Sequence, residues 1–160
     1  NNLDPMEFFS HLVREPAMSA RWNVPVVTRP DRVGWGWETG GRWLISPMAP
    51  YLAAPRVFIT SGRAISQAES IMGIVEAYRL GEIVGETTAG TNGDINPFVL
   101  PGGYAVSWTG MKVLKHDGSR HHGVGIRPTV PVQRTRAGVA DGRDEMLERA
   151  VEVVTRARTP

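Results

Sequence analysis

One serine stands where its hydroxyl could act as a nucleophile. Ser66 lies in residues 60–69, which join a short apolar run to a helical pattern, and it falls in the first turn of that helix. Backbone N–H groups in a first turn have no helical partner and lie at the positive end of the helix dipole. They can hold the oxygen anion that forms when a serine attacks a carbonyl. The N–H of Gln67, the next residue, is the expected donor.

The same residues also have a purely structural interpretation. Ser66 and Glu69 have the spacing of a capping box, in which the two side chains satisfy the free N–H groups of a helix start. The Gly-x-Ser-x-Gly pattern of another kind of nucleophile turn is not present around Ser66. On these residues alone, a nucleophile and a helix cap both remain open.

A glycine-bearing loop follows the next apolar run. Gly85 and Gly90 have the spacing of a phosphate-binding loop, but Thr91 stands where that motif needs lysine and Asn92 where it needs serine or threonine. No helical pattern follows the loop. We therefore exclude nucleotide binding for this segment.

Three histidines, His116, His121 and His122, lie close together farther along the chain. Neighbours on an extended chain point in opposite directions, and no carboxylate pattern accompanies these residues, so we expect no metal site. Whichever of His121 and His122 faces inward could serve as a base or an orienting imidazole.

Composition excludes several classes of function. The 160 residues include 18 cations and 16 anions, a net charge of +2 that no stretch concentrates, so we expect no nucleic-acid partner. The chain has no cysteine, which excludes disulfides, thiolate metal sites and a cysteine nucleophile. No apolar run reaches the roughly 20 residues that a membrane span needs. The first residue is Asn1 with no leader pattern after it, so we expect a piece of a longer protein.

The elements that must position Ser66 read as a strand, a helix and a second strand. Residues 56–60 (RVFIT) form a short apolar strand, residues 66–80 an amphipathic helix that Gly81 ends, and residues 82–85 another strand. This order predicts a parallel crossover connection. The chain as a whole then divides into residues 1–54 and residues 55–160.

The flanking segments predict further elements. Before the crossover we expect a helix over residues 4–14 and a hairpin over 32–46 that turns at Thr39-Gly40-Gly41. The three tryptophans of this hairpin could stack on a ligand, but packing of the hairpin onto the core is the favoured interpretation. After it we expect three antiparallel strands at residues 98–100, 104–109 and 112–116, and a closing amphipathic helix over 143–156.

Taken together, these segments resemble the C-terminal half of the catalytic domain of the tail-specific proteases, which include the C-terminal processing proteases and the tricorn core protease. The likeness covers about residues 55–155, while residues 1–54 resemble the family only loosely. The stretches that carry it are RVFIT (56–60), SGRAISQAES (61–70), GEIVGETTAGTNG (81–93), LPGGYAVSWTGMKV (100–113) and DGSRHHGVGIRPTV (117–130).

The resemblance implies an α/β fold of the Clp-protease/crotonase-like type, with a mostly parallel sheet flanked by helices and an antiparallel strand region. It places Ser66 at the nucleophile position and the Gln67 N–H in the oxyanion hole. The second oxyanion donor would come from a glycine-containing upstream loop, near or before Asn1. The implied reaction is hydrolysis of a polypeptide substrate without a metal or organic cofactor, in the periplasm or outside the cell.

The sequence departs from the family pattern at two positions. Thr91 replaces the lysine of the Ser/Lys members, so that mechanism needs Lys112 or Lys115 to reach across. His122 stands where tricorn-like members have glutamate, and those members take their base histidine from an upstream segment. Either His122 is the base for Ser66, or an upstream histidine is the base and His122 orients it. A catalytically inactive peptide-binding member and a crotonase-like acyl-CoA enzyme are the alternatives to a serine peptidase.

Overall fold

The computed structural model describes residues 5–31, 33–34 and 36–157. In chain order its helices and strands are α1 (Pro5–Ser10), β1 (Ala17–Met18), β2 (Trp22–Val26), β3 (Gly36–Thr39), β4 (Leu44–Ile45), β5 (Val57–Thr60), α2 (Gln67–Tyr78), β6 (Glu82–Gly85), β7 (Ile95–Val99), β8 (Ala105–Thr109), β9 (Lys112–Val113), β10 (Val130–Pro131), α3 (Arg136–Ala140) and α4 (Glu145–Arg156).

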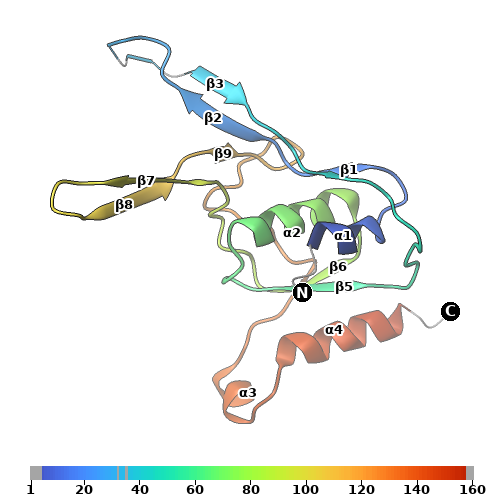
Figure 1. Cartoon of the computed structure of the whole chain (residues 1–160). Helices are drawn as coiled ribbons and strands as arrows, with labels where there is room; N and C mark the ends of the chain where they lie inside the picture. The colour runs from blue at the N-terminus through green and yellow to red at the C-terminus, as the bar shows by residue number, and fades with distance from the viewer. Residues whose placement is uncertain (1–4, 32, 35, 158–160) are drawn as a thin grey trace.

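The predicted crossover is present. β5 and β6 pair in parallel with Ile59 opposite Val84, and β10 adds a third parallel strand on the other side of β6. Helix α2 lies on one side of these strands and α4 on the other (Figure 1). This arrangement places the end of β5, the start of α2 and the loop after β6 at one edge of the sheet, because parallel strands end on the same side.

The residue that ends α2 is an arginine and not the expected glycine. The left-handed residue that ends the helix is Arg79, with φ 49° and ψ 48°, not Gly81. A Cβ on Gly81 would lie 2.5 Å from the carbonyl oxygen of Arg56. Gly81 is therefore needed for the close approach of two backbone segments, not for the helix cap.

The hairpin predicted for residues 32–46 is wrong. β3 pairs with β2, which precedes it, while β4 pairs with β1, so both partners of that segment lie earlier in the chain. Gly40 donates its N–H to the carbonyl oxygen of Trp22 at 2.7 Å. A Cβ on Gly40 would lie 3.2 Å from that oxygen, so this glycine serves close packing against β2 and not a hairpin turn.

The remaining antiparallel strands form two further pairings. β7 and β8 pair in a hairpin that extends away from α2 (Figure 1), while β9 pairs with β2 and not with β8. Helix α1 ends at Ser10, shorter than the expected 4–14. Asp4, Arg32 and Trp35, on which parts of these expectations rest, lie outside the described residues.

One hydrophobic core joins both halves of the chain. Its members Phe9, Leu12, Val13, Ala17 and Ile45 come from residues 1–54, and Met72, Ile74, Val75, Ile83 and Ile126 from residues 55–160. The expected α/β architecture, with a parallel sheet and antiparallel strands, is confirmed. None of the helices within the described ranges is long and apolar enough to cross a membrane.

Candidate active site

Ser66 occupies a strained turn between β5 and α2. It is the residue before the first helical turn, and its backbone has φ 52° and ψ −117°. A residue with a Cβ avoids this combination, which costs on the order of 1–3 kcal/mol where it occurs. Its side chain is exposed and makes no capping hydrogen bond. The turn therefore presents the hydroxyl outward instead of folding it onto the helix.

The capping-box interpretation does not hold in the structure. The Glu69 and Ser70 N–H groups both donate to the main-chain oxygen of Ser66, at 2.9 and 3.1 Å, so the backbone and not the hydroxyl satisfies them. The Glu69 carboxylate turns away toward the loop after β6. Among the described residues, the Gln67 N–H donates to no main-chain oxygen outside the helices and strands. That donor is available to a ligand at the helix start.

Glu69 is a buried carboxylate that ties α2 to the loop after β6. It accepts hydrogen bonds from Thr88 Oγ1 at 2.7 Å, Gly90 N–H at 2.6 Å and Thr91 N–H at 2.8 Å. Burial raises the pKa of this carboxyl, but the contacts with His121, Thr88, Gly90 and Thr91 outweigh it and lower the pKa to about 2. Glu69 is therefore ionised throughout the neutral range.

His121 is the inward-facing member of the histidine pair. Its ring is buried, and Nε2 lies 3.2 Å from Glu69 Oε1, within ion-pair distance but outside good hydrogen-bond alignment. The opposite directions of neighbouring side chains could have identified one inward histidine, but not which of the two it is. Sequence reasoning chose His122 through the family resemblance and passed over His121.

His122 is half-buried and faces a different neighbour. Its Nε2 accepts the Val113 N–H at a long 3.4 Å, and the two imidazole rings stand edge to face with centroids 6.3 Å apart. His116 lies elsewhere, with Nε2 2.8 Å from the main-chain oxygen of Met18. Within the described ranges, no three potential metal-ligating side chains gather into a site.

Both lysines are engaged away from Ser66. Lys115 Nζ forms an ion pair with Glu76 at 2.9 Å, and Lys112 Nζ lies over the Trp37 ring, 5.4 Å from its centroid. Thr91, which the sequence resemblance assigns to the lysine position, is exposed and contributes its backbone N–H to Glu69. Neither lysine is among the residues that line the pocket beside Ser66 in the described part of the chain.

Ser66 and Gln67 line one pocket of about 290 Å³. Trp22, Trp43 and Met111 form its apolar side, and His122 is not among its lining residues in the described part of the chain. The structure thus brings together two of the three predicted site residues.

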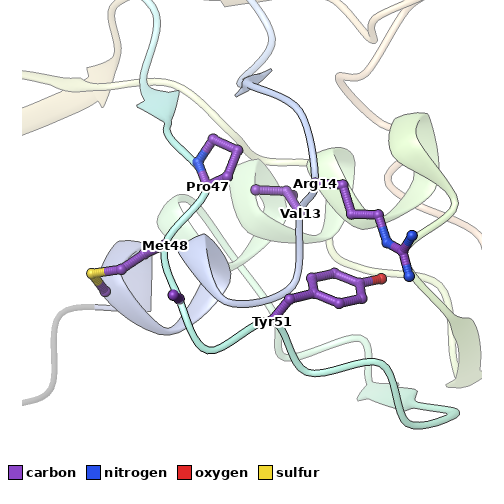
Figure 2. Close-up of a pocket in the computed structure, with 6 residues that line it drawn as sticks. Val13, Arg14, Pro47, Met48 and Tyr51 are labelled. Atoms are coloured by element: carbon purple, nitrogen blue, oxygen red, sulfur yellow. The ribbon is translucent and has the colours of Figure 1, made fainter.

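A second hollow, of about 370 Å³, contains none of the predicted site residues. Val13, Arg14, Pro47, Met48 and Tyr51 line it (Figure 2). The Arg14 guanidinium lies 4.5 Å from the centroid of the Tyr51 ring, and the neighbouring Arg14 and Arg56 lower the pKa of the Tyr51 hydroxyl. Among the described residues that line it, this hollow has no serine beside a free helix N–H group, so the Ser66 pocket is the candidate active site.

Comparison with known proteins decides the family. The sequence profile of peptidase family S41 matches residues 40–132, more than half of the chain. The chain belongs to peptidase family S41. The resemblance to the C-terminal processing proteases is thereby confirmed. No curated protein sequence matches the chain closely enough to count as a relative.

Solved structures share the fold of this S41 chain at low sequence identity. A candidate peptidase from Parabacteroides merdae superposes with a TM-score of 0.74 at 18% identity, over 93% of this chain and 46% of that one. Mature CPAF in complex with lactacystin gives 0.71 at 14% identity, over 93% and 40%. The photosystem II D1 C-terminal processing protease gives 0.53 at 18% identity, over 80% and 30%. The S41 chain spans less than half the length of these structures.

Proposed function

We propose that this chain carries the nucleophile of a serine endopeptidase whose substrate is a polypeptide. The observation that carries the proposal is the Ser66 turn. An S41 chain holds an exposed serine in a strained backbone conformation, with the hydroxyl free of the helix cap and a pocket beside it. Strain of this kind persists at sites where a function depends on the conformation. A serine that only capped α2 would not need it.

The proposed reaction begins with attack of Ser66 Oγ on the peptide carbonyl carbon. An imidazole takes the Oγ proton, and the carbonyl oxygen becomes an anion held by the Gln67 N–H at the positive end of α2. Collapse of this intermediate breaks the C–N bond, and the same imidazole returns the proton to the leaving amine. Water then hydrolyses the ester on Ser66 by the same steps.

The base could be one of two imidazoles, since neither Lys112 nor Lys115 lines the pocket beside Ser66 in the described residues. His122 is the candidate base within this chain; to act, its ring must bring a nitrogen within about 3 Å of Oγ. The alternative base is a histidine from a segment of the natural polypeptide outside these residues, with His122 orienting it. The absence of His122 from the lining of the pocket in the described residues favours the second arrangement.

A catalytically inactive, peptide-binding member of the family is the second candidate function. It is favoured by Thr91 and His122, which stand where active members of the family have lysine and glutamate. The two candidates differ in one measurable property, the reactivity of the Ser66 hydroxyl.

A fluorophosphonate probe tests this reactivity in the natural polypeptide that contains the chain. We expect covalent labelling at Ser66, located by peptide mass spectrometry, and its complete loss in Ser66→Ala. Ser107→Ala is the matched control, because Ser107 is an exposed serine on β8 and should leave labelling unchanged. A folded wild-type protein that takes up no probe would establish the inactive alternative. His122→Ala then separates the two bases, since a base is required for labelling and an orienting group only accelerates it.

A further inference from the structure

We propose that the pocket beside Ser66 binds a large apolar side chain, aliphatic or aromatic, of the substrate residue on the acyl side of the scissile bond. This inference rests on the proposed function, because it assigns a substrate residue to the same site. Nothing in the family match or in the structural likenesses assigns this specificity.

Two tryptophans make one wall of the pocket. The Trp22 and Trp43 rings meet edge to face, with centroids 5.5 Å apart, and Met111 extends the same apolar surface. Aromatic rings offer large contact areas, and a thioether adapts to the shape of what packs against it. An apolar substrate side chain that enters the pocket leaves water and packs against this apolar surface.

The wall is held in place by backbone hydrogen bonds. The Trp43 N–H donates to Ser19 Oγ at 2.9 Å, and the Ser19 N–H donates back to the Trp43 oxygen at 2.9 Å. The Trp22 oxygen accepts the Gly40 N–H at 2.7 Å, and Trp22 itself pairs with Val113 in the sheet. The main chain that carries both tryptophans is therefore held in place before a ligand arrives, which lowers the entropic cost of binding.

The position of Ser66 and Gln67 in the same pocket assigns the acyl side. The attacked carbon lies against Ser66 Oγ, and its oxygen points to the Gln67 N–H. That carbon is bonded directly to the Cα of the acyl-side residue, whereas the leaving side is one nitrogen farther away. The side chain nearest to the pocket therefore belongs to the acyl side.

The polar part of the pocket does not select a charged side chain. Asn92 Nδ2 donates to Ser70 Oγ at 2.9 Å, and this buried pair is bonded to itself. Asp94 is the one ionisable residue lining the pocket among the described residues, and it is exposed. Water and salt screen an exposed carboxylate, so its attraction for a basic side chain is weak. The volume of about 290 Å³ lies at the lower end of ligand pockets and suits a single side chain.

Peptidyl phosphonate probes that differ only in the acyl-side residue test the assignment in the natural polypeptide. The series carries leucine, phenylalanine, alanine, aspartate or lysine at that position, and the rate of Ser66 modification is measured by mass spectrometry. We expect leucine and phenylalanine to react about 10-fold faster than alanine, and aspartate slower still. Trp43→Ala should lower the leucine and phenylalanine rates toward the alanine rate, and by a larger factor than it lowers the alanine rate.

Matched variants keep the result interpretable. Trp37→Ala removes a tryptophan from β3 that is 51% exposed and does not line the pocket, so the preference should remain. Should Trp43→Ala unfold, Trp43→Phe and Met111→Ala report on the same wall, the first keeping and the second reducing the leucine preference.

Several results would overturn the inference. Equal rates across the series, or an equal loss for all probes in folded Trp43→Ala, would show that the pocket selects no side chain. A lysine preference that disappears in Asp94→Asn would assign the pocket to basic residues. Loss of all labelling, including that by the plain fluorophosphonate, would instead remove the proposed function on which this inference depends.

Discussion

The backbone of Ser66 is strained because this residue carries a Cβ in a conformation that favours glycine. Its φ of 52° is positive, and Arg79 is the other residue with a Cβ and positive φ in the described ranges. Arg79 adopts the common left-handed helix cap, with ψ 48°, whereas the ψ of −117° at Ser66 belongs to a region that glycine tolerates far better. Local sequence preference alone would not produce this turn; the packing of β5, α2 and the loop after β6 imposes it.

Replacing Ser66 by glycine should therefore stabilise the fold. We expect Ser66→Gly to raise the free energy of unfolding by about 1 kcal/mol, because relief of strain exceeds the added entropy of a glycine in the unfolded chain. Ser66→Ala keeps the Cβ and should leave stability nearly unchanged. Thermal unfolding followed by circular dichroism measures both variants. Ser107→Gly, in an exposed strand, should destabilise; a Ser66→Gly protein less stable than Ser66→Ala would refute the strain.

At the scale of elements, Glu69 joins three parts of the site. It links the first turn of α2 to Thr88, Gly90 and Thr91 in the loop after β6, and it meets His121 in the turn that follows β9. Thr88 Oγ1 also accepts the Ile126 N–H at 2.8 Å, which extends the network. Because every bond to Glu69 favours its charged form, the network depends on pH.

This dependence has a definite direction. The pKa of Glu69 is lowered from 4.5 to about 2 in the folded chain, so its stabilisation is complete above the unfolded value and is lost as pH falls from about 4.5 to 2. The stabilisation corresponds to about 3 kcal/mol at neutral pH. We expect Glu69→Gln to lose this at pH 7 and to approach the wild type near pH 2, measured by urea unfolding across pH.

A surface glutamate provides the comparison. Glu38→Gln changes an exposed residue of β3 and should track the wild type at every pH. A constant difference between Glu69→Gln and the wild type from pH 7 to pH 2 would show that the carboxylate charge plays no part. The rate of Ser66 labelling in Glu69→Gln gives a separate measure of whether the network also positions the nucleophile.

The elements built from neighbouring residues follow from the sequence, and those built from distant ones do not. The crossover of β5, α2 and β6 and the helix α4 carry local apolar patterns, and the structure contains them close to the predicted bounds. The pairing of β2 with β9 joins residues almost ninety positions apart, as with Asn23 and Lys112, and no local pattern encodes it. Gly40 misled the hairpin prediction because close packing and turns both select glycine.

The same distinction explains the site. Ser66 and Gln67 follow from a strand–helix junction, which is local. The pocket wall formed by Trp22 and Trp43 depends on the long-range arrangement of the sheets, which no local pattern predicts. For Trp43, the sequence favoured packing on the core. The role of Ser66, Gln67 and His122 in catalysis stays a prediction.

At the scale of the whole molecule, residues 1–54 contribute to the core that supports Ser66. Phe9 is 6% exposed, and its ring lies 5.8 Å from that of Phe58 in β5, the strand that leads to the Ser66 turn. The match to family S41 begins at residue 40 and so leaves this part of the core outside it. The first helix is nonetheless part of what holds β5 in place.

Truncating Phe9 should therefore destabilise the whole fold. We expect Phe9→Ala to cost about 3–5 kcal/mol, because it leaves a cavity in the shared core. Phe8→Ala is the matched control: Phe8 is 51% exposed and should cost less than about 1 kcal/mol. Urea unfolding measures both. Similar small losses for the two variants would mean that α1 is not integral to the core.

The contact between Glu69 and Thr91 uses the main chain of Thr91 and not its side chain. Glu69 accepts a hydrogen bond from the main-chain N–H of Thr91, and the Thr91 side chain stays exposed. Any residue with an N–H can make this hydrogen bond, so the side chain at position 91 can change without loss of the contact to Glu69. A substitution at position 91 can therefore alter the polar groups displayed near the start of α2 while the main-chain contacts that join α2 to the loop after β6 stay in place.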